Sequence, residues 1–327
     1  MKLKLLASPT HPALGILILA SLIVFFARRY FRSARHQAFP SLGWIGLAII
    51  LISEALLVLR VYWVTIYFTP LAWTGYLLLA DSLVASLQGT SRLRRSPRRF
   101  LALAAWSVPL WLIFEAYNLR LRNWTYVGLP ANPILRDLGY VWSFATIWPA
   151  IFETADFIRA LGLFRDPDDA PCQEISRRTL WILALCGLLC VAMPVLLPPH
   201  LGSYLFGPVW AGFALLLDPV NYHGKGASLL REWEKGRAAL LSSFLLAGLV
   251  CGFFWEFWNY WARARWIYIF PILQGWKIFE MPAPGFLGFP PFAVECFVMY
   301  EFLRTLKALF SKAAPSRELV PASREEA

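Results

Sequence analysis

Two short stretches of the sequence place a glutamate and an asparagine three residues apart inside an aromatic, apolar run. One stretch contains Glu115 and Asn118, and the other contains Glu256 and Asn259. A carboxyl group in apolar surroundings can hold a proton at neutral pH and deliver it. The faces of aromatic rings can stabilise a cation through their quadrupole. The pattern therefore predicts proton transfer to an apolar substrate, such as an alkene, with shelter for the resulting carbocation.

Each stretch continues with the same residue types. "LIFEAYNLRLRNWTYVGLP" and "FFWEFWNYWARARWIYIFP" both pass through Arg-x-Arg to Trp-x-Tyr and a proline. The arginines are placed to hold a phosphate or another anionic headgroup, or to snorkel to the membrane surface. The Trp-x-Tyr pairs also fit an interfacial aromatic belt. The candidate substrate-binding residues are Asn118, Asn259, Arg122, Arg265, Trp124, Trp266, Tyr126 and Tyr268.

Further acidic residues lie in apolar segments. Glu153 and Glu295 follow Pro149 and Pro291 at the same spacing, and two aspartates lie in other apolar runs. Acidic groups are costly in a bilayer, so they normally face a bundle interior or a wet cavity and have a role. The alternative is that they only hydrogen-bond neighbouring helices. The candidate catalytic residues are Glu115, Glu153, Glu256, Glu295, Asp81 and Asp218.

The elements that must position these residues are membrane helices. The chain is 58% hydrophobic and 16% charged, which is too apolar for a soluble chain of 327 residues. Its apolar runs approach the ~20 residues that cross a bilayer, and a helix satisfies its own backbone there. The sequence predicts an all-α, polytopic integral membrane protein with about nine transmembrane helices, at 12–27, 43–59, 67–87, 101–118, 139–160, 179–197, 204–219, 239–257 and 284–306.

The basic residues predict the orientation. Most of the 31 Lys and Arg residues fall on the cytoplasmic side if the N-terminus is outside and the C-terminus is cytoplasmic. The net charge of +11 is then a topology signal, because it is scattered over short loops, and nucleic-acid binding is not expected. The expected location is the cytoplasmic (inner) membrane of a bacterium, and the expected partner is a membrane lipid or an isoprenoid ligand.

The polar pattern repeats along the chain, which predicts an internal duplication. "PLAWTGYLLLAD" parallels "PVWAGFALLLD" upstream of the two glutamates, and "PAIFE" parallels "PFAVE" downstream. Four helices per copy would give two parallel repeats about an axis along the membrane normal. The predicted organisation is an anchor helix with a basic flank at 1–36, a first four-helix repeat at 37–165, a cytoplasmic linker at 166–178, a second four-helix repeat at 179–311 and a disordered tail at 312–327.

Cysteine and histidine indicate neither a disulfide framework nor a metal site. Four of the five cysteines lie in apolar spans, where helix packing explains them. The four histidines are isolated and carried by predicted loops. No metal and no cofactor is therefore predicted.

The segment from Glu115 to Phe157 resembles the repeated helical domain of the integral membrane lycopene cyclases. The resemblance rests on the glutamate, the Trp-x-Tyr pair, Gly139 and the Pro-x-x-x-Glu ahead of "TADF". It implies proton-initiated, redox-neutral cyclisation of an isoprenoid without a metal. It also implies that Glu153 and Glu295 are the motif glutamates and that Asn118 or Glu115 holds the first acidic position. The family has adjacent glutamates after its proline, whereas this chain has Pro-x-x-x-Glu.

Three classes of function remain open from the sequence. The first is a membrane-embedded enzyme that acts on an isoprenoid or another lipid by carboxylate acid–base chemistry, as a cyclase or isomerase. The second is a transporter or lipid-binding protein with a carboxylate site near mid-membrane. The third is a non-catalytic scaffold. The substrate, the direction of any reaction and the oligomeric state do not follow from the sequence.

Overall fold

The computed structural model of the chain describes residues 10–35, 37–167, 172–224 and 226–311. The tail predicted to be disordered, 312–327, lies outside the described residues. The elements in chain order are α2 (Pro12–Arg32), α3 (Ser41–Val58), α4 (Tyr62–Gln88), α5 (Arg92–Arg95), α6 (Pro97–Leu121), β1 (Trp124–Val127), α7 (Pro133–Ala145), α8 (Ile147–Ala160), α9 (Arg177–Leu196), α10 (Pro199–Gly202), α11 (Phe206–His223), α12 (Leu229–Glu234), α13 (Ala239–Trp261), β2 (Arg265–Tyr268), β3 (Lys277–Ile278), β4 (Met281–Pro282), the 3-10 helix η1 (Ala283–Gly288) and α14 (Phe289–Ser311).

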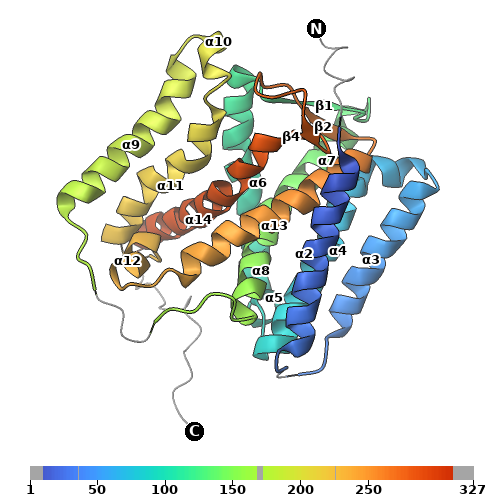
Figure 1. Ribbon diagram of the computed structural model, residues 1–327, viewed down its shortest axis with the longest axis horizontal. Coiled ribbons are helices and arrows are strands. Elements are labelled where there is room, and N and C mark those ends of the chain that lie inside the picture. The colour runs from blue at the N-terminus through green and yellow to red at the C-terminus, as the bar shows by residue number, and fades with distance from the viewer. Residues whose placement is uncertain (1–9, 36, 168–171, 225, 312–327) are drawn as a thin grey trace.

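Long helices form the body of the molecule. The pairs α3–α4 and α9–α11 lie at its two sides, and α8, α13 and α14 pack between them (Figure 1). The strands and α10 lie at one end, here called the ribbon end, and α5 and α12 lie at the opposite end, here called the α12 end (Figure 1). The helix-rich prediction is confirmed, with two short two-stranded ribbons as the sheet structure of the described residues.

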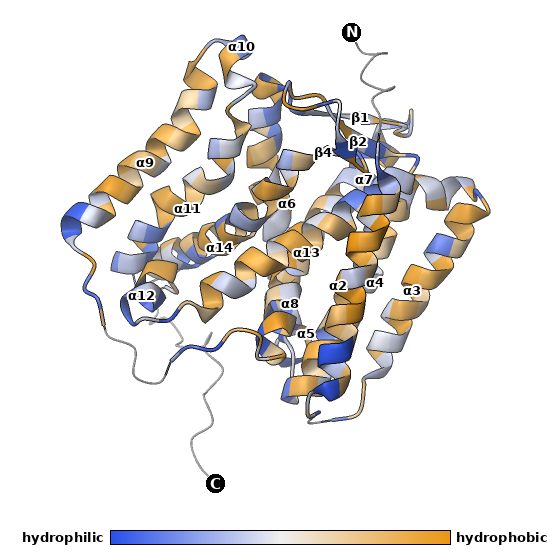
Figure 2. Ribbon diagram, viewed as in Figure 1, coloured by the Kyte–Doolittle hydropathy of each residue, from blue (hydrophilic) through white to orange (hydrophobic). Residues whose placement is uncertain are grey.

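Seven helices within the described ranges are long and apolar enough to cross a membrane. They are Pro12–Arg32, Ser41–Val58, Tyr62–Gln88, Pro97–Leu121, Arg177–Leu196, Ala239–Trp261 and Ala283–Ala308. Figure 2 shows mostly apolar residues along α2, α3 and α9. The basic residues of α2 lie toward its end, and those of α9 lie at its start.

The two other expected spans differ from the prediction for identifiable reasons. The segment 139–160 is broken at Thr146 into α7 and α8. Pro149 explains the break, because it lacks the N–H that would bond back into the preceding turn, and is tolerated in the first turn of a new helix. The segment 204–219 forms α11, whose last turns carry Asp218 and Asn221. These polar residues lower its mean hydropathy, and α11 is not among the seven helices named above.

Glycine pairs set the close approach within both lateral helix pairs. A Cβ on Gly46 of α3 would lie 2.5 Å from the carbonyl oxygen of Gly75 in α4. A Cβ on Gly187 of α9 would lie 2.7 Å from the carbonyl oxygen of Gly212 in α11. Small residues let membrane helices approach to backbone contact, so the same device joins each pair.

An aromatic core fills the space between the helices. Trp73, Trp148 and Trp258 are almost wholly buried. The indole nitrogen of Trp148 in α8 donates to the carbonyl oxygen of Cys296 in α14 at 2.9 Å, which joins two helices far apart in sequence. A buried tryptophan usually has such a partner, whereas Nε1 of Trp73 has none among the described residues.

Candidate functional site

The ribbon of β1 and β2 joins the two Trp-x-Tyr motifs. The strands are antiparallel, with Trp124 opposite Tyr268 and Tyr126 opposite Trp266. Side chains alternate along a strand and opposite residues share a face, so these four aromatic residues lie on one face of the ribbon. All four line the same cavity.

This aromatic cavity has a volume of about 280 Å³, near the lower end of the roughly 300–1,000 Å³ of typical ligand sites. Its lining is mostly apolar, with a few polar groups that include Arg136, Arg265 and Ser143. Residues from α4, α6, α7, α8, α11, α13, η1 and α14 also line it. Besides the ribbon, the rings that line it include Trp73, Trp111, Tyr140, Trp210, Trp255 and Phe292.

Glu115 reaches the ribbon from α6 and accepts three hydrogen bonds on one oxygen. The hydroxyl of Tyr126 donates at 2.5 Å, the indole of Trp111 at 2.9 Å and the indole of Trp124 at 3.2 Å. Hydrogen bonds from three donors favour a carboxylate. Burial, and next the neighbouring Glu115, raise the pKa of Tyr126 well above its usual value, so this phenol is a neutral donor near pH 7.

Glu256 makes the related contact from α13 with fewer donors. It is wholly buried, and its Oε1 accepts from the hydroxyl of Tyr268 at 2.7 Å. Its Oε2 is buried and has no hydrogen-bond partner among the described residues. The indole of Trp266 donates to the Tyr268 hydroxyl at 2.9 Å instead of to the carboxyl group. Burial, and next Glu256, raise the pKa of Tyr268 well above its usual value.

Asn118 and Asn259 hold the strands in place. The Asn118 oxygen accepts from the backbone N–H of Trp124 at 3.0 Å, and its amide donates to the carbonyl of the same residue at 3.0 Å. Asn259 brackets Trp266 in the same way, both at 2.9 Å. The two asparagines, predicted as substrate-binding residues, thus contact the backbone of the residues that line the cavity.

The two candidate arginines differ in position. Arg122 caps α6 in a left-handed conformation, with φ of 54°, and its side chain is exposed. Arg265 lines the aromatic cavity, and its Nε lies 3.6 Å from Glu280. The structure therefore brings Arg265 to the cavity and leaves Arg122 at the surface.

Glu153 and Glu295 lie deeper, toward the α12 end. Glu153 is six residues beyond the cavity-lining Ile147, or about 9 Å along the helix axis. Both of its oxygens are buried without a hydrogen-bond partner in the described part of the chain, and Arg92 Nε lies 3.9 Å from Oε1. Glu295 accepts from the backbone N–H of Phe213 at 2.7 Å. These two carboxyl groups are buried near the cavity and have no contact with the ribbon.

Asp81 and Asp218 hold the short helices at the α12 end. Asp81 accepts from Ser91 Oγ at 2.8 Å and from the N–H of Leu93 at 2.9 Å. Asp218 accepts from Ser228 Oγ at 3.1 Å and from the N–H of Leu230 at 2.8 Å. These contacts place both aspartates away from the residues that line the cavity.

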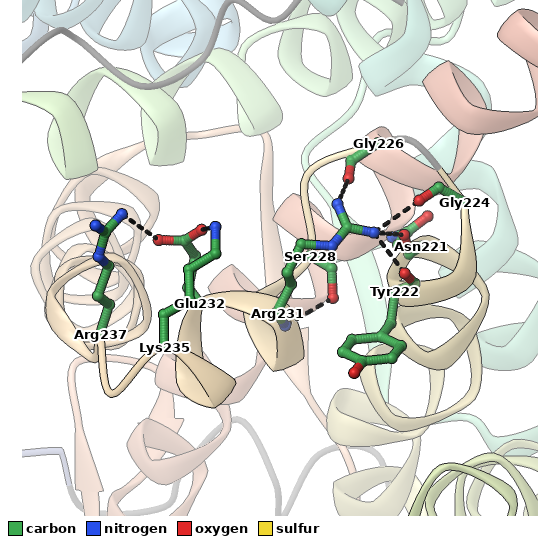
Figure 3. Close-up of polar contacts among 9 residues, drawn as sticks. All are labelled: Asn221, Tyr222, Gly224, Gly226, Ser228, Arg231, Glu232, Lys235 and Arg237. Atoms are coloured by element: carbon green, nitrogen blue, oxygen red, sulfur yellow. Dashed lines mark hydrogen bonds and ion pairs between the residues drawn. The ribbon is translucent and has the colours of Figure 1, made fainter. Parts of the chain in front are cut away.

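Arg231 completes the turn beside Asp218. Its guanidinium donates to the carbonyl groups of Asn221, Tyr222, Gly224 and Gly226, as Figure 3 shows. Asn221 and Tyr222 lie in the last turn of α11, and the two glycines follow it. The side chain thereby satisfies carbonyl groups that the end of a helix leaves without intrahelical partners, together with two of the following loop.

Several residues that line the cavity were not predicted from the sequence. Trp111 had a local signal, because it precedes Glu115 by four residues and so lies on the same face of the helix. Arg136, Tyr140 and Trp210 reach the cavity only through tertiary packing. Lys277 is almost fully buried, and burial lowers its pKa while Glu280 and Glu256 oppose that shift.

Comparison of the chain with protein-family models, with curated proteins and with solved structures found no match. The residues around the cavity therefore carry the functional argument.

Proposed function

We propose that this chain is a membrane-embedded enzyme that acts on an isoprenoid or a related unsaturated lipid by acid–base chemistry in the aromatic cavity. One observation carries the proposal: two Tyr–Glu pairs, Tyr126 with Glu115 and Tyr268 with Glu256, face one aromatic cavity. An apolar lining suits a hydrocarbon, and its ring faces suit a cationic intermediate. The family resemblance in the sequence implies the same chemistry.

The unequal hydrogen bonding of the two glutamates supports different roles. Glu115 has three donors on one oxygen, which favours a carboxylate and hence a base. Glu256 has one donor and a second, unpartnered oxygen, which is where a carboxyl proton would reside. Two carboxyl groups in different environments are a common basis for acid and base assignments.

The proposed step is an isomerisation without a redox change. In this step the Glu256 carboxyl group turns so that its proton points to the Tyr268 oxygen, which reverses the hydrogen bond of the resting structure. Tyr268 then gives its own proton to an alkene carbon and receives the proton of Glu256, so a C–H bond forms, a C=C π bond breaks and Glu256 is left as a carboxylate. A second alkene of the substrate attacks the cation and closes a ring. A neighbouring carbon then loses a proton to Tyr126 and Glu115. One proton enters and one leaves, so the product is an isomer of the substrate.

We also propose that the chain is a duplicated four-helix unit, with the N-terminus outside. Equivalent bonds at Asp81 and Asp218, at Asn118 and Asn259, and the symmetric register of β1 and β2 support the duplication. Arginines concentrated at the α12 end, in and beside α2, α5 and α9, support the orientation.

The test is organic extraction of purified protein, followed by chromatography and mass spectrometry of the bound lipid. The comparison is wild type against Glu256→Gln, which keeps the shape of the side chain and loses the proton. A cyclic isomer with wild type and an acyclic isomer of equal mass with the variant would support the enzyme. The same acyclic lipid in both would reject catalysis.

A second candidate is lipid binding or transport, and the broken helices beside the cavity favour it. α4 has a non-helical residue at Tyr67, before Pro70, and α7 gives way to α8 at Thr146. Interrupted helices next to a central site are a feature of transporters. In that case extraction would yield one unchanged lipid from wild type and from Glu256→Gln.

A further inference from the structure

A second hollow lies beside the aromatic cavity at the ribbon end. It is bounded by the end of α3, the start of α4 and the end of α13, and has a volume of about 750 Å³. Three arginines, Arg60, Arg263 and Arg265, line it, together with a single acidic residue, Glu54. We call it the arginine groove. Positive charge therefore exceeds negative charge among its lining residues.

Arg60 stands at a backbone position that favours glycine. Its φ is 56°, in the left-handed region, directly after α3. The turn is fixed by bonds from its N–H to Leu57 at 2.9 Å and from Val61 to Leu56 at 3.0 Å. Glycine is the usual residue at such a helix end, and a left-handed backbone costs free energy for a residue with a Cβ. Arg60 thus presents a cation where the fold alone would favour glycine.

Arg263 is held in place by two contacts, and its guanidinium group can still bind an anion. Its backbone N–H donates to the Thr65 carbonyl at 2.8 Å, and its guanidinium lies over the Tyr62 ring, 5.2 Å from the centroid. Stacking on the ring leaves the N–H edge of the guanidinium for a planar or tetrahedral anion. Within the described residues, the guanidinium groups of Arg60 and Arg263 donate no hydrogen bond. Glu54 is engaged by the Trp258 indole at 3.2 Å.

The remaining walls of the groove are apolar. They include Leu57, Val58 and Phe68 on one side and Phe257 and Trp261 on the other. α3 and α13, which supply most of them, are two of the helices long enough to cross a membrane. Inorganic phosphate has no apolar part that could contact these walls. A lipid headgroup with attached acyl chains matches both the charge and the apolar surface.

We propose that the arginine groove binds the phosphate headgroup of an anionic lipid. This site is separate from the proposed catalytic cavity and does not rest on the proposed activity. Arg265 lines both hollows and forms the wall between them.

Native mass spectrometry of the detergent-purified full chain tests this. Phosphatidylglycerol, phosphatidylcholine and inorganic phosphate are added in separate titrations to wild type, Arg60→Gln and Arg263→Gln. The matched control is Arg120→Gln, from the equivalent Arg-x-Arg of the other half. Arg120 donates to the Leu197 carbonyl at 3.2 Å and lies outside the groove.

The proposal expects wild type to bind phosphatidylglycerol in preference to phosphatidylcholine. Each groove variant should weaken that binding about fivefold, the effect of one arginine at a lipid surface, and Arg120→Gln should not. The two variants alter different elements, so a folding defect in one, seen as a lowered Tm, leaves the other informative. Equal binding of both lipids, or unchanged binding in both variants, would overturn the proposal. Displacement of the lipid by millimolar inorganic phosphate would assign the groove to a free anion instead.

Discussion

Tyr268 donates its hydroxyl hydrogen to the buried carboxyl group of Glu256 at 2.7 Å, and the same tyrosine lines the aromatic cavity. The Tyr268 side chain therefore links the buried Glu256 to the cavity. Tyr126 and Glu115 form the related pair on the other strand of the ribbon. The two pairs come from segments about 140 residues apart and meet because β1 pairs with β2.

Removing the Tyr268 hydroxyl should interrupt the proposed proton transfer. We expect Tyr268→Phe to lower the turnover rate by about 10²–10⁴-fold, the usual contribution of a positioned acid, with the lipid still bound. The measurement is the single-turnover rate with the lipid identified by extraction. The control is Tyr222→Phe, which removes a Tyr–Glu hydrogen bond of 2.8 Å, to Glu234, away from the cavity. An unchanged rate in Tyr268→Phe would remove this tyrosine from the mechanism.

Arg231 should be worth far more to stability than its neighbour Arg237. Arg231 donates to four backbone carbonyl groups, whereas Arg237 makes one ion pair of 3.8 Å with Glu232 (Figure 3). Hydrogen bonds from a charged donor contribute about 1.5–3 kcal/mol each. We expect Arg231→Gln to lower the free energy of unfolding by at least about 3 kcal/mol and Arg237→Gln by less than about 1 kcal/mol. Denaturant titration in mixed micelles measures both, and equal losses would contradict the assignment.

Leucine substitutions at two glycines, Gly187 and Gly275, should change the stability of the protein to different extents. Leucine at Gly187 would force α9 away from α11, since even a Cβ would lie 2.3 Å from the Leu216 nitrogen. We expect Gly187→Leu to destabilise the protein by about 1–3 kcal/mol or more. Gly275→Leu is the control, because no atom lies within 4 Å of an added Cβ there. Thermal unfolding in detergent compares them, and a Tm for Gly187→Leu no lower than that of the control would refute the close packing.

The buried tyrosines of the ribbon predict how stability changes with pH. The pKa of Tyr126 and of Tyr268 is raised in the folded chain, mainly by burial and next by the neighbouring glutamates. Above about pH 10 the unfolded chain loses these phenolic protons while the folded chain keeps them. The contribution of these two phenols to the free energy of unfolding is therefore fully present below about pH 10. It is lost as the pH rises toward and through their pKa values in the folded chain.

The measurement is Tm at pH 8 and pH 11 for wild type and for Tyr126→Phe/Tyr268→Phe. The variant should lose less stability than wild type over this interval, because two titrating groups are gone. An equal loss would mean that the ribbon tyrosines titrate normally.

The sequence predicted the local parts of the site better than their assembly. Glu115, Asn118, Trp124 and Tyr126 lie within twelve positions, so one helix end and the strand that follows bring them together. The second segment has the same residue types at Glu256, Asn259, Trp266 and Tyr268, but the hydrogen bond between Tyr268 and Glu256 was not predicted. Residues that join the cavity through packing, such as Trp210, have no such local signal.

The aspartates and the segment 139–160 show where sequence reasoning was less complete. Asp81 and Asp218 were predicted as catalytic residues, and the structure gives each a serine ten residues later as a hydrogen-bond partner. That contact depends on where each helix ends, which hydropathy does not show. The segment 139–160 was predicted as one span because it is apolar, but the helix breaks at Thr146. Pro149 was the local residue that indicated this break.

The most direct test of the proposed chemistry is one turnover of the purified protein in D₂O with the acyclic lipid as substrate. The incoming proton comes from Tyr268 and Glu256, which exchange with solvent, so the cyclic product should carry one deuterium on carbon. Glu256→Gln should form no product and leave the substrate unlabelled. A product without deuterium, or labelled product at the wild-type rate from Glu256→Gln, would contradict protonation by this pair.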